Sequence, residues 1–189
     1  MNHETHKTGT SWRLTRLGIP IALAMLVLPT VALADAVQWT EAEGENGHWY
    51  QLAVDTHLVF WEAQNQCTST GGHLVTITSE GERDFIYELQ NDNADSASWI
   101  HLGGYQDYDS PDFSEPGGGW TWVTGEPWEY TDWQAQQPGC CGPNEDWLAR
   151  QASDWEGWHD GPDGARPYMI EWSADCNGDG IVDYGQILD

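Results

Sequence analysis

The side chains best suited to chemistry lie in an acidic, tryptophan-rich segment that runs from Trp120 to Asp160. Within it, Gln137, Glu145 and Asp160 offer amide and carboxylate oxygens. Oxygens of these types are the ligands that calcium prefers in proteins. The segment therefore predicts a calcium site. The alternative is that Glu145 and Asp160 only accept hydrogen bonds that stabilise a loop.

A second oxygen-rich pattern lies at the end of the chain. Gly180 falls at position 6 of a calcium-loop spacing, where the backbone must turn sharply, but Gln186 replaces the bidentate carboxylate expected at position 12. The segment resembles half of a dockerin-type module, and weakened calcium binding is expected. The alternative is an acidic turn in a tail. The predicted ligands at positions 1, 3, 5 and 9 are Asp175, Asn177, Asp179 and Asp183.

Catalytic motifs are not recognisable in this sequence. No serine, cysteine or histidine stands in a known nucleophile motif. His159 and Asp160 beside Glu145 imitate an acid–base pair, since neighbouring carboxylates can divide those roles. In a chain with 31 acidic residues such a coincidence carries little weight. The protein is therefore predicted not to be an enzyme.

Two helices are expected among the elements that position these residues. The first covers residues 58–67, with Leu58, Trp61 and Ala63 buried on one side. Ser79 with Glu82 three residues later is a capping-box pattern that begins the second helix. The apolar residues of that second helix are Phe85, Ile86 and Leu89.

Short strands complete the predicted domain. A first strand is expected within residues 35–50, with His48, Trp49 and Tyr50 as its aromatic part. Two helices combined with short strands predict an α+β domain. The other expected strands are 74–77, 99–103, 119–123 and 168–172, and a Pro/Gly/Asp loop is expected at 107–118.

Glycine and proline interrupt every periodic run between Trp120 and Asp160, which excludes one long helix or strand there. A long irregular loop held by buried aromatic side chains is expected, and loops of this length in a compact domain are usually functional. The tryptophans expected in the core are Trp122, Trp147 and Trp158. Those expected to be exposed are Trp128, Trp133 and Trp155.

Taken in order, these motifs resemble the C-type lectin-like domain family over residues 39–172. No single motif is specific for the family, whereas the order of the motifs is. The resemblance implies the C-type lectin-like fold, a carbohydrate ligand and calcium as cofactor. The motifs are Trp61-Glu-Ala63 with Cys67, Gly71-Gly-His-Leu74, Ser79-Glu-Gly-Glu82, Trp99-Ile-His-Leu102-Gly103, the loop segment and Tyr168-Met-Ile-Glu171.

In sugar-binding members of this family, a calcium ion at the loop tip is held by a Glu-Pro-Asn or Gln-Pro-Asp triplet, a later Glu and a Trp-Asn-Asp triplet. Sugar hydroxyls can share the ion, because calcium accepts up to about eight oxygens. Gly139 lacks a side chain, and the imidazole of His159 is a poor calcium ligand. By residue order the matching positions are Gln137-Pro138-Gly139, Glu145 and Trp158-His159-Asp160, so Gln137, Glu145 and Asp160 are the candidate metal ligands and His159 joins them in binding the sugar.

The resemblance also implies a second, structural calcium that joins the second helix to the last strand. Glu82 and Glu171 stand at its ligand positions, with the backbone of Thr76 nearby. For Glu82 the other interpretation is a plain capping box.

Four cysteines allow three disulfide pairings, which the sequence does not rank. In the family the cysteine at the Cys67 position pairs with one in the last strand, where this chain has Ile170, and Cys176 offers a substitute. The adjacent Cys140 and Cys141 leave three possibilities open: a vicinal bridge, bridges to another chain and free thiols.

Residues 1–34 have the layout of a secretory signal peptide. Lys7, Arg13 and Arg16 precede an apolar run that ends in a small-residue cleavage pattern. The alternative, a membrane anchor, is disfavoured because two prolines interrupt a run already short for spanning. Residues 35–172 are then the lectin-like domain and 173–189 the calcium-loop tail of a secreted or extracytoplasmic protein that is not inserted in a membrane.

Charge limits the partners of this protein. Removal of residues 1–34 leaves three arginines against 30 acidic residues, a net charge of −27. Nucleic acid and anionic membrane surfaces are poor partners for such a protein, because phosphate binding needs clusters of Lys and Arg, and no nucleic-acid partner is predicted. Cation binding suits such a protein, and the small number of cysteines favours a bacterial source.

These observations predict an exported carbohydrate-binding domain that uses calcium through its long loop, with a glycan or glycoconjugate as partner. The alternative is a protein-interaction or envelope-assembly module of the same fold, with another extracellular protein as partner and no sugar. The incomplete triplet favours the alternative, and the loop length and tryptophans favour the first. Gly139→Asp with His159→Asn is expected to recreate the galactose-type arrangement and so to strengthen sugar binding.

Overall fold

The computed structural model describes residues 36–40, 46–93, 98–139, 144–152 and 157–173. The chain divides into two units, Met1–Thr30 and Val31–Asp189, and every described residue belongs to the second. The expected signal peptide and the four tail ligands lie outside the described residues. Within the described ranges, no helix is long and apolar enough to cross a membrane.

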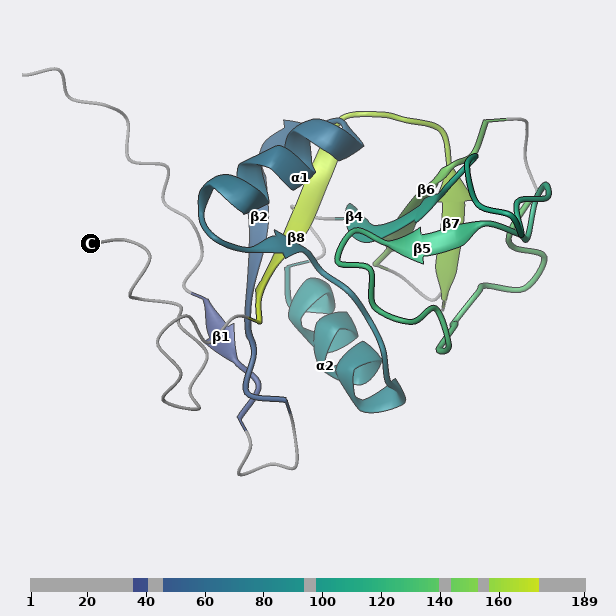
Figure 1. Ribbon diagram of the computed structural model, residues 1–189. Coiled ribbons are helices and arrows are strands. Elements are labelled where there is room, and N and C mark those ends of the chain that lie inside the picture. The colour runs from purple at the N-terminus through teal and green to yellow at the C-terminus, as the bar shows by residue number, and fades with distance from the viewer. Residues whose placement is uncertain (1–35, 41–45, 94–97, 140–143, 153–156, 174–189) are drawn as a thin grey trace, which may run out of the picture. The chain divides into compact units, whose positions relative to one another are not determined.

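Two helices and eight strands form the described part of the domain (Figure 1). All eight strands belong to one sheet with the order β1-β2-β8-β4-β6-β7, while β3 pairs with β8 and β5 pairs with β4. The predicted α+β class is therefore confirmed. The helices are α1 (Phe60–Ser69) and α2 (Glu80–Asn91), and the strands are β1 (Val37–Gln38), β2 (Trp49–Leu58), β3 (His73–Leu74), β4 (Trp99–Gln106), β5 (Trp120–Trp122), β6 (Trp147–Gln151), β7 (Trp158–Gly161) and β8 (Arg166–Trp172).

Strand β8 closes the domain. It runs antiparallel to β2, with Trp172 opposite Trp49, and parallel to β4, with Tyr168 opposite His101. The first long strand and the last strand are therefore neighbours, and all the described strands between them in sequence belong to the same sheet.

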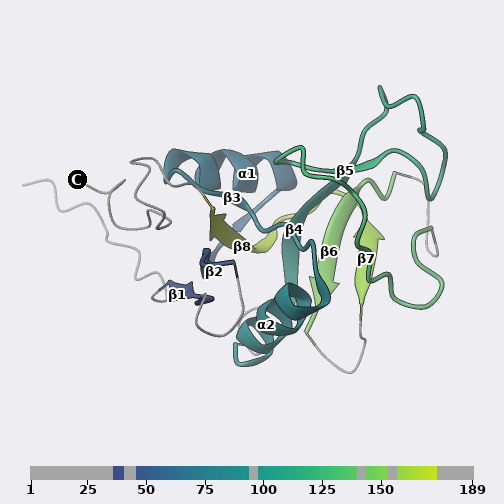
Figure 2. The same cartoon turned by 60° about the horizontal axis from the view of Figure 1, so that its bottom comes forward.

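Alternate side chains of β8 pack into two separate clusters, as the twofold period of a strand requires. Ile170 packs with the buried face of α1, and Met169 packs in the cluster that contains Ile86 of α2. Figures 1 and 2 both place the two helices on different sides of β8. Glu171, two residues after Met169, consequently belongs to the α2 side of the sheet.

Helix α1 is present, but it buries a different face from the one predicted. Phe60, Ala63 and Cys67 are buried, and their spacing places them on one stripe of a helix. Trp61, expected in the core, is 45% exposed. Leu58 ends β2 instead of opening the helix. The predicted helix is confirmed. Of its predicted buried residues, Ala63 is fully buried and Leu58 is partly buried, whereas the prediction for Trp61 is wrong.

Helix α2 begins where the capping-box pattern predicted. The hydroxyl of Ser79 accepts a hydrogen bond from the backbone N–H of Glu82 at 3.2 Å, which satisfies one free donor of the first turn. The reciprocal half of the box is not formed, because the carboxylate of Glu82 bonds to Thr78 instead. Of the three apolar residues predicted for this helix, Ile86 is fully buried and the other two are partly buried.

The segment between Trp120 and Asp160 is less irregular than predicted. The described residues between β5 and β6 form no helix or strand of the sheet, as expected. However, Trp147–Gln151 and Trp158–Gly161 are strands that the prediction missed. All four residues of β7 are buried. A strand buried on both faces lacks the alternation of polar and apolar residues by which strands are recognised.

Five tryptophans of this segment form one aromatic cluster: Trp120, Trp122, Trp128, Trp133 and Trp158. Trp122 and Trp158 are buried, as predicted. Trp128 and Trp133 are partly buried and not exposed as expected: their ring centroids lie 4.5 Å from that of Trp122 and 5.9 Å from that of Trp158, respectively. Trp147 is partly buried near α1, and Trp155 lies outside the described residues.

Cys67 is the one cysteine within the described residues. It is a free, buried thiol in the same cluster as Ile170, so a hydrophobic contact stands where the family resemblance implied a disulfide. Burial raises the pKa of this thiol, which keeps it protonated. The pairing of Cys140, Cys141 and Cys176 lies outside the described residues.

Candidate functional site

Residues that are far apart in the sequence line one cavity of about 480 Å³, which we call the loop cavity. Gln137, Glu145, His159 and Asp160, the four residues predicted at the loop tip, all line it. Strand β7 carries two of them, and pairing with β6 places Asp160 opposite Leu148. The structure therefore brings together all four predicted ligand-binding residues.

Two hydrogen bonds join the Gln137–Gly139 turn to β7. The backbone N–H of Gly139 donates to Oδ2 of Asp160 at 2.6 Å, and Nε2 of Gln137 lies 3.1 Å from Nδ1 of His159. An imidazole nitrogen without a proton accepts a hydrogen bond, so this contact fits the His159 tautomer with its proton on Nε2. His159 thus orients the glutamine of the triplet.

Gly139 occupies a backbone position that resists any side chain. Its φ is 93°, in the left-handed region that residues other than glycine avoid. A Cβ at this position would lie 2.5 Å from both Cβ and Cγ of Pro116. The side-chain ligand that the family carries here is therefore excluded by the shape of the turn, as well as missing from the sequence.

Asp160 is the cavity carboxylate that is most strongly perturbed. The residue is 6% exposed, and its Oδ1 has no hydrogen-bond partner among the described residues. Burial raises the pKa of Asp160 to about 6; the N–H of Gly139 lowers that pKa, and the charge of Glu145 raises it further. A buried carboxylate of this kind is stabilised by a bound cation or an added hydrogen-bond donor.

Asp160→Asn is expected to stabilise the calcium-free protein at pH 7.5. Because the pKa is higher in the folded than in the unfolded chain, the folded protein binds the proton more tightly, and ionisation lowers stability as pH rises from about 4 to about 6. The amide removes this penalty, so the gain disappears at pH 4. Urea unfolding in chelator at both pH values measures it, with exposed Asp112→Asn as control. An equal gain at both pH values would contradict the assignment.

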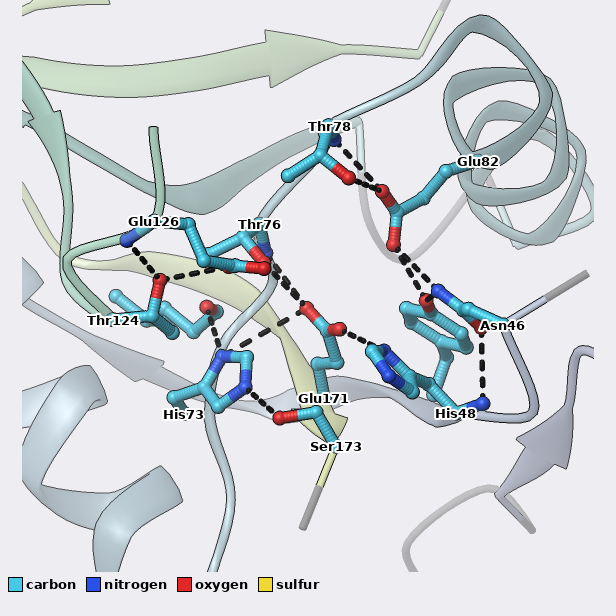
Figure 3. Close-up of polar contacts among 12 residues, drawn as sticks. Asn46, His48, His73, Thr76, Thr78, Glu82, Thr124, Glu126, Glu171 and Ser173 are labelled. Carbon is cyan, nitrogen blue, oxygen red and sulfur yellow. Dashed lines mark hydrogen bonds and ion pairs between the residues drawn. The ribbon is translucent and has the colours of Figure 1, made fainter. Parts of the chain in front are cut away.

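A second group of possible ligands, the carboxylate cluster, consists of His48, Glu82 and Glu171 (Figure 3). One ligand atom of each residue lies within 4.8 Å of the others. Glu82 comes from the first turn of α2, Glu171 from β8, and His48 stands directly before β2. Both glutamates, which were predicted to share a structural calcium, are buried and face one another.

Glu82 is held by donors on both of its oxygens. Its Oε1 accepts hydrogen bonds from the hydroxyl of Tyr50 at 2.7 Å and from Nδ2 of Asn46 at 3.1 Å. Its Oε2 accepts from the N–H and hydroxyl of Thr78 at 2.7 and 3.0 Å. Burial and the nearby charge of Glu171 nevertheless raise the pKa of Glu82. A positive charge beside the two carboxylates would relieve this.

Glu171 is bound by Thr76 on one side and His48 on the other. The N–H and hydroxyl of Thr76 donate to Oε2 at 2.8 and 3.0 Å, and Nδ1 of His48 lies 2.7 Å from Oε1. Burial lowers the pKa of His48, but the hydrogen bond and charge of Glu171 outweigh it, so the net shift is upward. Protonation of this imidazole, which the raised pKa favours, supplies positive charge that a metal ion would otherwise bring.

His48, Tyr50 and Thr78 were not identified from the sequence as members of this cluster. A signal existed for two of them, because His48 and Tyr50 are two residues apart on an expected strand and so share one face. Their proximity to Glu171 depends on the register of β2 with β8, where Tyr50 lies opposite Glu171. That register joins residues about 120 positions apart, so no local sequence pattern predicts it.

Comparison with known proteins gives a consistent result. A family model described as the lectin C-type domain matches residues 56–170. The C-type lectin domain family 4 member F of Rattus norvegicus is 26% identical over 136 residues, which cover 58% of this chain and 22% of that protein. The crystal structure of the C-type lectin CEL-I from Cucumaria echinata matches with a TM-score of 0.57 at 21% identity, covering 67% of this chain and 91% of that one. A calcium-independent type II antifreeze protein matches with a TM-score of 0.55 at 21% identity, covering 74% and 95%.

Proposed function

Because the chain belongs to the lectin C-type domain family, we propose that its described domain is a carbohydrate-binding module that holds a glycan in the loop cavity with the help of calcium. The observation that carries this proposal is the convergence of Gln137, Glu145 and Asp160 on one cavity. The chain spans only 22% of the rat relative's length, so the proposal concerns this domain.

Calcium suits the loop cavity because of the oxygens that line it. Asp160 has one carboxylate oxygen bound to a backbone N–H and another with no partner in the described residues. Glu145 adds a second carboxylate, and Gln137 adds an amide. Three protein residues leave ligand positions open for sugar hydroxyls and water, since calcium takes about six to eight oxygens.

We extend the proposal to two further calcium sites. In the carboxylate cluster, Glu82 and Glu171 would hold the ion, which would replace the hydrogen bond between His48 and Glu171. The tail would bind a third ion through Asp175, Asn177, Asp179 and Asp183. Residues 1–34 would serve as signal peptide, so that the domain acts outside the cytoplasm on a glycan or glycoconjugate without catalysis.

A protein-interaction module without sugar binding is the second candidate function. It is favoured by the turn at Gly139, which places a backbone N–H on Asp160 where a metal ligand shell would need a side-chain oxygen. It is also favoured by the imidazole of His159 at the position of an amide.

A glycan panel probed with the chain from residue 35 onward tests the leading proposal. Binding is expected in calcium and is expected to be lost in chelator. Glu145→Gln and Asp160→Asn are each expected to weaken binding at least about tenfold, the effect of losing one charged hydrogen-bond partner. Exposed Glu129→Gln is the matched control. If a folded, calcium-loaded protein binds no glycan, the protein-interaction function takes precedence.

Calcium is expected to raise the melting temperature by mass action. At a hundredfold excess over the dissociation constant, one site contributes about 2.7 kcal/mol of stability. Differential scanning calorimetry in calcium and in chelator measures the total. Titration calorimetry of Asp175→Ala with Asp179→Ala is expected to count one ion fewer and to leave glycan binding unchanged. Equal melting temperatures in calcium and in chelator would contradict all three sites.

A further inference from the structure

The three arginines after residue 34 differ in what they contact. Arg83 forms ion pairs with Asp84 and Asp132. Arg150 is buried, bonds to Gln90 and lies over an aromatic ring. Arg166, by contrast, forms no ion pair with any described residue and lines the loop cavity. Among the described residues, Asp163 is the carboxylate whose charge acts on Arg166, but the two form no ion pair. In so acidic a protein, a cavity guanidinium without an ion pair in the described part of the chain calls for an explanation.

The guanidinium of Arg166 is only half satisfied. Its Nη2 donates to the backbone oxygen of Pro162 at 3.2 Å, while Nη1 is buried and has no hydrogen-bond partner among the described residues. Gly161 and Gly164 lie beside the guanidinium: a Cβ added at either would be 3.6 or 3.7 Å from Nη2, an ordinary van der Waals contact. Leaving a buried charged donor unpaired is unfavourable, and an anionic acceptor would correct it.

The rest of the cavity matches a sugar ring. Trp99 lines the wall with a partly exposed indole whose centroid lies 5.1 Å from that of His159. An aromatic face of this kind packs against the C–H groups of a sugar. Oδ1 of Asp160 is an acceptor without a partner in the described residues, which suits a hydroxyl donor.

We infer that the loop cavity takes a saccharide bearing a carboxylate group, such as a uronic acid, with the carboxylate on the guanidinium of Arg166 and a hydroxyl on Asp160. This inference rests on the proposed function and adds the chemical class of the sugar. Arg166 selects the ligand, since a guanidinium forms paired hydrogen bonds with a carboxylate. The negative surface of the domain opposes an anionic ligand over long range, and calcium bound beside Asp160 reduces that repulsion.

Matched glycosides that differ only at one carbon test the inference. Methyl galactoside is compared with methyl galacturonide, and methyl glucoside with methyl glucuronide, by titration calorimetry in calcium. The acidic member of at least one pair is expected to bind about tenfold or more tightly, as for a hydrogen bond to a charged group. Arg166→Gln is expected to reduce the acidic member to the affinity of the neutral one, and Arg83→Gln is expected to leave the preference intact.

Each outcome decides between the inference and the proposed function. Equal or tighter binding of the neutral members, or a preference that survives Arg166→Gln, overturns the inference and leaves the lectin function standing. Failure of all four glycosides and of the glycan panel contradicts both. Arg166→Lys covers the case in which the glutamine variant does not fold: it keeps the charge and the stem but loses the planar fork, so a reduced acid preference is expected. An undiminished preference in Arg166→Lys would also count against the inference.

Discussion

Replacing Glu171 by alanine is expected to lower the free energy of unfolding by about 3–5 kcal/mol, the effect of removing one partner from a buried ionic network. The change leaves the N–H and hydroxyl of Thr76 and the Nδ1 of His48 without their acceptor. Each unsatisfied buried group costs about 1–3 kcal/mol. The loss follows from the burial of Glu171 at 1% exposure, since water cannot replace the missing oxygens.

Urea unfolding measures this loss, and its pH dependence tests whether a histidine contributes to it. His48 is the closer of two candidates, since Nδ1 of His73 lies 3.8 Å from Oε2 of Glu171. The pKa of His48 is raised in the folded protein, so its pairing with Glu171 contributes fully below about pH 6.5 and is lost as pH rises through the folded pKa. The difference between the parent and Glu171→Ala is therefore expected to be larger at pH 5.5 than at pH 9. Exposed Glu129→Ala is the control, because Glu129 is not among the charges that raise the pKa of His48. A loss below 1 kcal/mol at pH 5.5 would show that the cluster is not a stabilising network.

The fold was predictable where the relevant signal is local. Ser79 and Glu82 marked the start of α2, because a helix cap is made within four residues of chain. The buried face of α1 was not predictable in this way. Phe60 and Trp61 are both large and aromatic, and only packing against the sheet decides which of them is buried. Strands β6 and β7 were missed for a related reason: their burial on both faces comes from neighbours distant in sequence.

The candidate site likewise contains residues that could be predicted from the sequence and residues that could not. Residue order was enough to place Gln137, Glu145 and Asp160 together, because the family resemblance carries long-range information that periodicity lacks. It was not enough to place Arg166 in the same cavity. That position depends on the pairing of β8 with β2, which no local pattern reports. Nor could the sequence reveal that the turn at residue 139 is closed to side chains.

Gly139→Asp is expected to lower the free energy of unfolding by about 2–5 kcal/mol, from left-handed strain of about 1–2 kcal/mol together with overpacking of about 1–3 kcal/mol. The φ of 93° and the 2.5 Å approach to Pro116 are the structural reasons. Movement of the turn would also remove the N–H that Asp160 accepts. The expectation from residue order, that Gly139→Asp with His159→Asn strengthens calcium and galactose binding, is therefore opposed by the structure.

Pro116→Gly separates the two contributions in a double-mutant cycle, because it removes both carbons that the new Cβ would meet. Gly139→Asp is expected to cost about 1–3 kcal/mol less in the Pro116→Gly background, the part of its effect that comes from overpacking. Pro116→Ala is the matched control, since it keeps Cβ and hence part of the clash. Only with the clash removed is His159→Asn expected to add calcium-dependent galactose binding, measured by titration calorimetry. If Gly139→Asp with His159→Asn is as stable as the parent and binds galactose while Pro116 is present, the turn is adaptable and the site is an ordinary member of the galactose-binding branch.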